Sequence, residues 1–141
     1  MVMRISKNRI DLDDKTLQKP VLKDYGEALV KANSGTSYTI DLTAGNVFKI
    51  TMTGNVTFTF SNPPASGTAG SFTLILIQDG TGSRTATWPT SVKWSGGTAP
   101  TLTTTATTGT DVLTFTTMNG GTTWLGLLGG SDMQSPPVLN E

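Results

Sequence analysis

Acid–base chemistry in this chain would have to come mainly from carboxylates, because the sequence has no histidine and no cysteine. The commonest general base, metal ligand and activated nucleophile are therefore missing. In the weakly charged part of the chain, the carboxylates at expected strand ends or turns are Asp41, Asp79, Asp111 and Asp132. Aspartate at such positions usually accepts hydrogen bonds from nearby backbone amides. We expect these residues to be structural, and we predict no catalytic residue and no enzymatic activity.

A second group of carboxylates lies near the N-terminus, in the run Asp11-Leu12-Asp13-Asp14. Their density could attract calcium, but the glycine and the terminal bidentate glutamate of an EF-hand loop are absent. The chain also lacks zinc-ligand spacing, a phosphate-binding loop and a G-x-S-x-G sequence. We expect the acidic run to be solvated or to pair with cations of a neighbouring subunit, and we predict no metal ion and no cofactor.

Three tryptophans are the other side chains that could bind a ligand. An exposed indole near loops can stack on a sugar ring, although tryptophan is more common in cores and interfaces. Trp88 and Trp94 flank Pro89 in a short segment, and we take both as candidate glycan-binding or interface residues. Trp124 follows an expected hairpin and is predicted to lie in the core.

Charge is concentrated at one end of the chain. Residues 1–31 carry seven Lys/Arg and five Asp/Glu, whereas the other 110 residues carry only eight charges. Charge keeps a free monomer soluble and opposes edge-to-edge pairing of strands. The weakly charged body therefore predicts packing against copies of itself, with the charged segment as a tether. The predicted partner-binding residues of this tether are Arg4, Lys7, Arg9, Asp11, Asp13 and Asp14.

Length and composition narrow the class of protein. A chain of 141 residues is expected to form one domain with a core of useful size. A formal net charge of zero gives no reason to expect nucleic-acid binding. No apolar run approaches the ~20 residues of a membrane helix. The basic N-terminus is not followed by the apolar stretch of a secretory signal, so we expect synthesis in the cytoplasm and no membrane partner.

Alternation of apolar and polar residues predicts an all-β domain over residues 36–130. Asn119-Gly120-Gly121 is a strong hairpin signal, and residues 101–110 are expected to be extended or an edge strand. We predict an antiparallel sandwich, jelly-roll-like, with an extended N-terminal arm over 1–35 that holds at most one short helix after Pro20. Residues 131–141, which contain two prolines, are predicted to be a tail. The expected strands are 37–42, 47–52, 56–60, 71–78, 84–88, 91–94, 111–118 and 122–128.

The segments 37–82, 86–104 and 111–130 together resemble a recurrent β-domain of tailed-bacteriophage virion structural proteins. The elements that carry the resemblance are the Gly45-Asn46 turn, the Asn62-Pro63-Pro64 loop, the Thr87-Trp88-Pro89 corner, the Gly97-Thr98-Ala99-Pro100 loop and the Asn119–Trp124 hairpin. Such domains occur at the tips of tail fibres and in small free-standing virion proteins. The resemblance implies a structural protein of the virion, made in the host cytoplasm, and supplies no catalytic residue.

Two functions follow from this resemblance. In the first, the protein is a capsid decoration (cement) protein on the capsid exterior. It forms an oligomer, expected to be a trimer, and its arm clamps major capsid protein subunits. In the second, it is a short tail-fibre or host-recognition component. Its arm then docks on a tail hub or baseplate protein, and the loops at Pro63-Pro64, Trp88-Pro89 and Gly96-Gly97 bind a cell-surface glycan. A polysaccharide depolymerase is the least favoured alternative, because no carboxylate pair is evident.

Overall fold

The computed structural model describes residues 3–13 and 15–138, and over this part of the chain the regular structure is almost all β. The only helical element there is one short 3-10 turn, η1 (Ser95–Gly97). The strands are β1 (Arg4–Ser6), β2 (Arg9–Asp11), β3 (Leu29–Asn33), β4 (Ser37–Asp41), β5 (Val47–Met52), β6 (Val56–Ser61), β7 (Gly70–Gln78), β8 (Ala86–Thr87), β9 (Val92–Lys93), β10 (Thr110–Thr117) and β11 (Trp124–Gly130).

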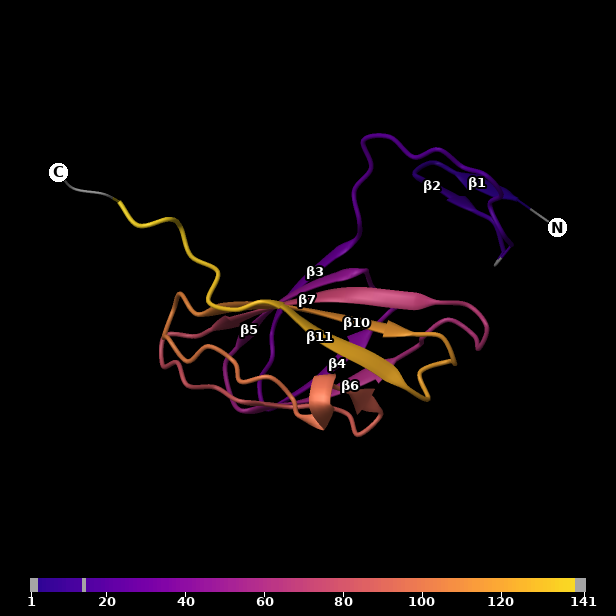
Figure 1. Ribbon diagram of the computed structural model, residues 1–141. Coiled ribbons are helices and arrows are strands. Elements are labelled where there is room, and N and C mark those ends of the chain that lie inside the picture. Colours follow the sequence, from indigo (N-terminus) through magenta and orange to yellow (C-terminus); the bar gives the residue numbers. More distant parts are fainter. Residues whose placement is uncertain (1–2, 14, 139–141) are drawn as a thin grey trace.

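Two sheets pack face to face and form the body of the molecule (Figure 1). The larger sheet has the strand order β3-β5-β7-β10-β11-β9, and the smaller one has the order β4-β6-β8. From β3 to β8 the chain alternates between the two sheets, and each strand lies parallel to the strand two places earlier. The first part of the sandwich is therefore a coil in which one pass of the chain stacks on the next.

Polar groups at the corners of this coil hold successive passes in register. At one corner, the amide of Thr53 donates to the Ser34 hydroxyl, and the amide of Thr85 donates to the Asn55 side-chain oxygen. Gly54 lies at this corner, where a Cβ would be 3.1 Å from the carbonyl oxygen of Gly35 in the previous pass, which is closer than a Cβ usually packs. Corners of this kind can stack only if each carries small or hydrogen-bonding residues.

The C-terminal part of the larger sheet is antiparallel. β10 pairs antiparallel with both β7 and β11, and the turn between β10 and β11 contains Gly120 and Gly121 at positive φ, as the hairpin signal predicts. The short strand β9 then pairs parallel with β11. Sequence analysis was right about an all-β sandwich, but the expectation of antiparallel pairing throughout is wrong, and the jelly-roll arrangement is not confirmed. Long connections return the chain to the same end of the sheet, which makes parallel neighbours.

The core lies between the inner faces of the two sheets. Strand alternation predicts its members correctly, since Ile40, Phe48, Ile50 and Phe58 are all at most 2% exposed. An aromatic cluster fills the centre, where the ring of Phe72 stacks on Phe115 with 5.0 Å between centroids. Trp124 is 2% exposed and contacts the same cluster, as its position after the hairpin predicts.

Residues 101–109 form a loop outside the sheets, so of the two expectations for residues 101–110, extended chain or an edge strand, the edge strand is wrong. Polar side chains from the core side hold the backbone of this loop. The carboxylate of Asp111 accepts the amide of Thr103 at 2.7 Å, and the Gln78 amide donates to the carbonyl of Thr103 at 2.7 Å. These side chains satisfy the loop backbone in place of a neighbouring strand, which local β-propensity cannot reveal.

The N-terminal arm is extended, and within its described residues no helix follows Pro20. β1 and β2 form a small antiparallel hairpin that pairs Ile5 with Ile10 and is set off from the sandwich (Figure 1). The last part of the predicted arm, β3, pairs parallel with β5 and forms one edge of the larger sheet. An isolated two-stranded hairpin is marginal in water. The expectation that the arm becomes ordered by lying on another protein stays a prediction.

Candidate binding surfaces

The aspartates that could have served as catalytic groups are structural in their contacts. Asp41 Oδ1 accepts the amide and hydroxyl of Thr43 and the side-chain amide of Asn62. Asp111, 2% exposed, accepts the Thr103 hydroxyl and the amide of Asp132 in addition to the Thr103 amide. Each of these two carboxylates therefore accepts hydrogen bonds from residues of its own turn or of adjacent loops. The contacts of Asp41 and Asp111 therefore agree with the structural role expected from the sequence.

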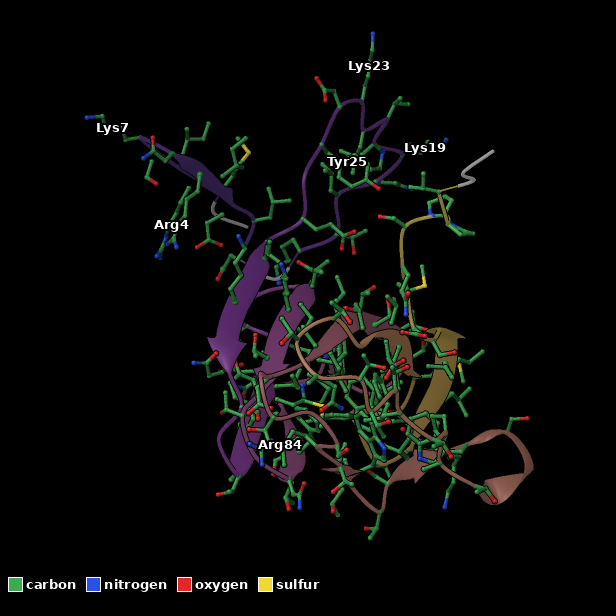
Figure 2. All side chains as sticks on the ribbon, turned by 90° about the vertical axis from the view of Figure 1, so that its left-hand side faces the viewer. Arg4, Lys7, Lys19, Lys23, Tyr25 and Arg84 are labelled. Carbon is green, nitrogen blue, oxygen red and sulfur yellow. The ribbon has the colours of Figure 1, made fainter. Side chains whose placement is uncertain are left out.

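Asp79 forms an ion pair with Arg84. Its carboxylate accepts the amides of Thr81 and Gly82 and lies 2.8 Å from the Arg84 guanidinium. Hydrogen bonds from Arg84 hold the pKa of Asp79 below its ordinary value, and those from Asn62 and Thr43 do the same for Asp41. Figure 2 shows Arg84 toward the end of the sandwich opposite the arm. The hydrogen bonds that lower these two pKa values also stabilise the turns, and a carboxyl with a lowered pKa does not suit a general acid.

Trp88 is half-buried and is part of the aromatic cluster. Its ring stacks on Phe58 with 5.2 Å between centroids and 14° between planes, and it contacts the edge of Trp94 at 5.4 Å. The ring of Trp88 also borders a hollow of about 220 Å³ beside Pro100 and Leu102. Because Phe58 stacks on the ring of Trp88, this residue contributes mainly to packing.

Trp94 is half-buried, as Trp88 is, and borders a different hollow. Its ring contacts Phe115 at 5.6 Å on one side and borders a hollow of about 250 Å³ on another. Ser95, Thr98 and Pro100 supply one wall of this hollow, and β11 supplies the other. The arrangement combines an indole with small polar side chains, which is a surface on which the apolar face of a sugar can lie while its hydroxyls are hydrogen-bonded.

Gly126 is a determinant of this hollow that the sequence analysis missed. A Cβ on Gly126 would lie 2.7 Å from Cζ3 of Trp94 and 2.9 Å from Cγ1 of Val92. Only glycine at this position lets the indole lie directly on the backbone of β11. The signal was a glycine in the middle of an otherwise apolar strand, which marks close approach of another group.

The predicted partner-binding residues of the arm lie on or beside the β1–β2 hairpin and are not brought to the tryptophans. Arg4 is opposite Asp11 in the pairing register, and Arg9 lies 3.6 Å from the carboxylate of Asp11. The amide of Asp13 donates to that same carboxylate at 2.9 Å. Figure 2 shows Arg4 and Lys7 on the hairpin, and Asp14 lies outside the described residues.

The outer face of the larger sheet is a third candidate surface. Ile75 and Ile77 of β7 are half-buried on this face, which no other sheet of the described residues covers. β7 is a central strand of the larger sheet, and among the sheets of the described residues only the smaller one covers it, on its inner face. Leu125 and Leu127 of β11 are 44% and 58% exposed on the same side. The three strands β7, β10 and β11 therefore present an uncharged and partly apolar outer face.

Within the described residues there is no cluster of three or more acidic side chains placed to hold a metal ion. The same part of the chain contains no helix of the length and apolarity needed to cross a membrane.

Comparison with known proteins now assigns the class. Residues 33–123 match the family model described as "Putative phage tail fibre C-terminal domain", which makes this a structural β-domain of a bacteriophage virion. The chain belongs to this phage tail fibre C-terminal domain family. The searches of curated proteins and of solved structures found no match. The family match favours the tail-fibre alternative over the capsid decoration protein that sequence analysis placed first.

Proposed function

We propose that this protein is a tail-fibre component that binds a glycan on the host cell surface, and that it has no enzymatic activity. The match of residues 33–123 to a tail-fibre domain family is the observation that carries the proposal. Its location is tested by the copy number per virion, measured by quantitative mass spectrometry against the major capsid protein. A small fixed number of copies is expected. Near parity with the major capsid protein would contradict the proposal and restore the capsid decoration hypothesis.

The proposed glycan-binding site is the hollow beside Trp94. The indole supplies an apolar surface for a sugar ring, and Ser95 and Thr98 supply hydroxyls at its rim. Trp88 helps to position Trp94, because its ring contacts the ring of Trp94 and stacks on that of Phe58. A site of this size fits one or two sugar units, so affinity for the cell surface would rest on several copies acting together.

The hollow can be tested without disturbing the core. Thr98 and Thr101 are exposed loop residues that border the Trp94 hollow and the Trp88 hollow, respectively. We expect Thr98→Arg to abolish binding to a glycan array or to host cells, because the long side chain fills the Trp94 hollow. The matched variant Thr101→Arg adds the same charge and should bind like the parent protein. If Thr101→Arg loses binding and Thr98→Arg does not, the glycan binds in the Trp88 hollow instead. If both variants bind like the parent protein, neither hollow is the glycan-binding site.

We further propose that the outer face formed by β7, β10 and β11 packs against copies of the chain in a homotrimer. The observation that supports this is its lack of charge together with the exposed leucines of β11. Thr114 lies near the centre of the face, opposite Thr73 and Leu127 in the strand register. Thr114→Arg should turn the trimer into a monomer in analytical ultracentrifugation. A parent protein that is monomeric at high concentration would contradict this arrangement.

In this proposal the arm is the attachment device. The residues at its hairpin would make ion pairs and strand additions with a tail hub or baseplate protein. The support is that these residues lie on or beside the β1–β2 hairpin, which is set off from the sandwich (Figure 1), and that all of them except the half-buried Asp11 are exposed. The residues concerned are Arg4, Lys7, Arg9, Asp11 and Asp13.

A further inference from the structure

The charges on the outer face of the larger sheet all have one sign. Its six strands, every one of which lies in the described part of the chain, carry four charged residues. Asp111 points into the core and is 2% exposed. The three that point outward are lysines: Lys31 on β3, Lys49 on β5 and Lys93 on β9.

Two of these lysines are direct neighbours. Lys31 of β3 is in register with Lys49 of the parallel strand β5, and both side chains are exposed. Adjacent strands lie about 4.8 Å apart, so two like charges start from neighbouring positions on the same face. Neither lysine lies within 4.0 Å of a described carboxylate, since the ion pairs of the described residues are Arg9–Asp11 and Arg84–Asp79. Such a pair repels itself unless an anion lies between or beside the two ammonium groups.

The lysine pair borders one of two hollows that follow the β3–β5 edge. The first, of about 390 Å³, is lined by Lys31, Lys49, Asn33 and Thr51 together with Ala32. The next pair along these strands, Leu29 with Val47, lines a second hollow of about 540 Å³ that also contains Tyr25 and Glu27. Because Leu29 and Lys31 are alternate residues on one face of β3, the two hollows form one strip along this edge.

We propose that this strip binds an acidic saccharide, with the carboxylate or phosphate group of the sugar between Lys31 and Lys49. Asn33 and Thr51, in register with each other, supply an amide and a hydroxyl for the neighbouring sugar hydroxyls. Tyr25, which is 67% exposed, offers a ring on which a further sugar can stack beside Leu29 and Val47. Figure 2 shows Tyr25 on the bend of the arm, together with Lys19 and Lys23. The inference rests on the proposed glycan-binding function and adds the chemical class of the glycan and a second contact surface.

Glu27 gives the proposal an internal control. Glu27 lines the hollow that contains Tyr25, whereas the lysine pair lines the other hollow. An anionic group held by the lysines would feel weak repulsion from Glu27, whereas a neutral sugar would not. Glu27→Gln should therefore tighten binding of acidic saccharides and leave neutral saccharides unchanged.

The test uses the full chain and two acidic probes, each with a neutral counterpart. Oligogalacturonate is compared with its methyl ester, and phosphorylated dextran with unmodified dextran. The comparison distinguishes a carboxylate from a phosphate ligand.

Isothermal titration calorimetry should show a Kd at least about tenfold weaker for the double variant Lys31→Gln/Lys49→Gln, because two charge-assisted hydrogen bonds are lost. The matched variant Lys93→Gln removes a lysine from the opposite edge of the same sheet and should change the Kd by less than about twofold. Thermal unfolding verifies that these exposed substitutions leave the fold intact.

Three outcomes would overturn the inference. Equal losses in the double variant and in Lys93→Gln would mean general attraction of polyanions. Equal binding of acidic and neutral probes would mean that the charge is not recognised. A change in oligomeric state with unchanged binding would assign Lys31 and Lys49 to a contact between subunits. If the acidic probes do not bind at the lysine pair but cell binding still depends on Thr98, the inference fails and the proposed function stands. If the acidic probes bind at the lysine pair but the protein does not bind host cells, only the proposed function is refuted.

Discussion

Replacement of Gly126 by alanine tests how the Trp94 hollow is built. The added Cβ would lie 2.7 and 3.0 Å from two carbons of the Trp94 ring and 2.9 Å from Cγ1 of Val92. Carbon atoms pack best at about 3.5–4.0 Å, so three contacts are too close by roughly half an ångström or more. The strand β11 must shift or the indole must leave its place. Overpacking of this size costs about 1–3 kcal/mol in the free energy of unfolding.

The matched control for this substitution lies on the same strand. A Cβ on Gly129 would meet only the carbonyl oxygen of Val112, at 3.4 Å, and neither glycine has a positive φ. Both Gly→Ala changes reduce the entropy of the unfolded chain equally, which by itself stabilises by about 0.4–1 kcal/mol. Gly129→Ala should therefore be neutral or slightly stabilising.

Urea unfolding followed by tryptophan fluorescence gives the comparison. The protein concentration must be the same for all variants, because an oligomer's stability depends on it. Gly126→Ala should have the lower midpoint, a changed emission maximum from Trp94 and weaker glycan binding. If Gly126→Ala and Gly129→Ala unfold at the same urea concentration, the close approach of Trp94 to β11 does not define the hollow, and the reasoning fails.

Three further predictions concern the buried aspartate, the surface ion pair and the arm. Asp111→Ala should lower the free energy of unfolding by about 2–4 kcal/mol in urea titrations, because the amide and hydroxyl of Thr103 lose their acceptor; an unchanged midpoint would show that this loop does not depend on the carboxylate. The pKa of Asp79 is lowered in the folded state by Arg84, so its contribution to stability is present above the ordinary carboxyl pKa and is lost as the pH falls through the folded value. The acid limb of a plot of stability against pH should accordingly be shallower in Asp79→Asn, and an identical limb would contradict this. Deletion of residues 1–20 should leave the near-UV circular dichroism of the sandwich unchanged and abolish incorporation into virions, whereas normal incorporation of the truncated chain would exclude the arm as the attachment device.

Much of the fold could be predicted from local patterns. The alternation of apolar and polar residues located β5 at its observed bounds and placed Phe48, Ile50 and Met52 in the core. The Asn119-Gly120-Gly121 sequence located the hairpin between β10 and β11, because this turn needs residues that adopt positive φ. Each of these sequence patterns predicts a structure formed by the same few residues, so it can be recognised without knowing how the rest of the chain folds.

The partners of each strand could not be predicted in the same way. Period-two alternation shows that one face of a strand is buried but does not show which strand lies beside it. The coil that stacks β3, β5 and β7 in parallel depends on long connections returning to the same end of the sheet, and nothing in each strand alone encodes that return. Local sequence also did not decide the conformation after Pro20. A short helix was considered there, but the structure shows extended chain that leads into β3.

The candidate sites, like the fold, could be predicted from the sequence only in part. The sequence by itself determined that the protein lacks histidine and cysteine, concentrates its charge in the N-terminal segment and carries Trp88 and Trp94 near loops. Only the tertiary structure decided that Trp94 borders a hollow over Gly126 and that Lys31 and Lys49 are neighbours on one face. The physical reason is that a binding surface is made by residues distant in the chain, and their proximity depends on strand register and on the stacking of successive passes of the coil.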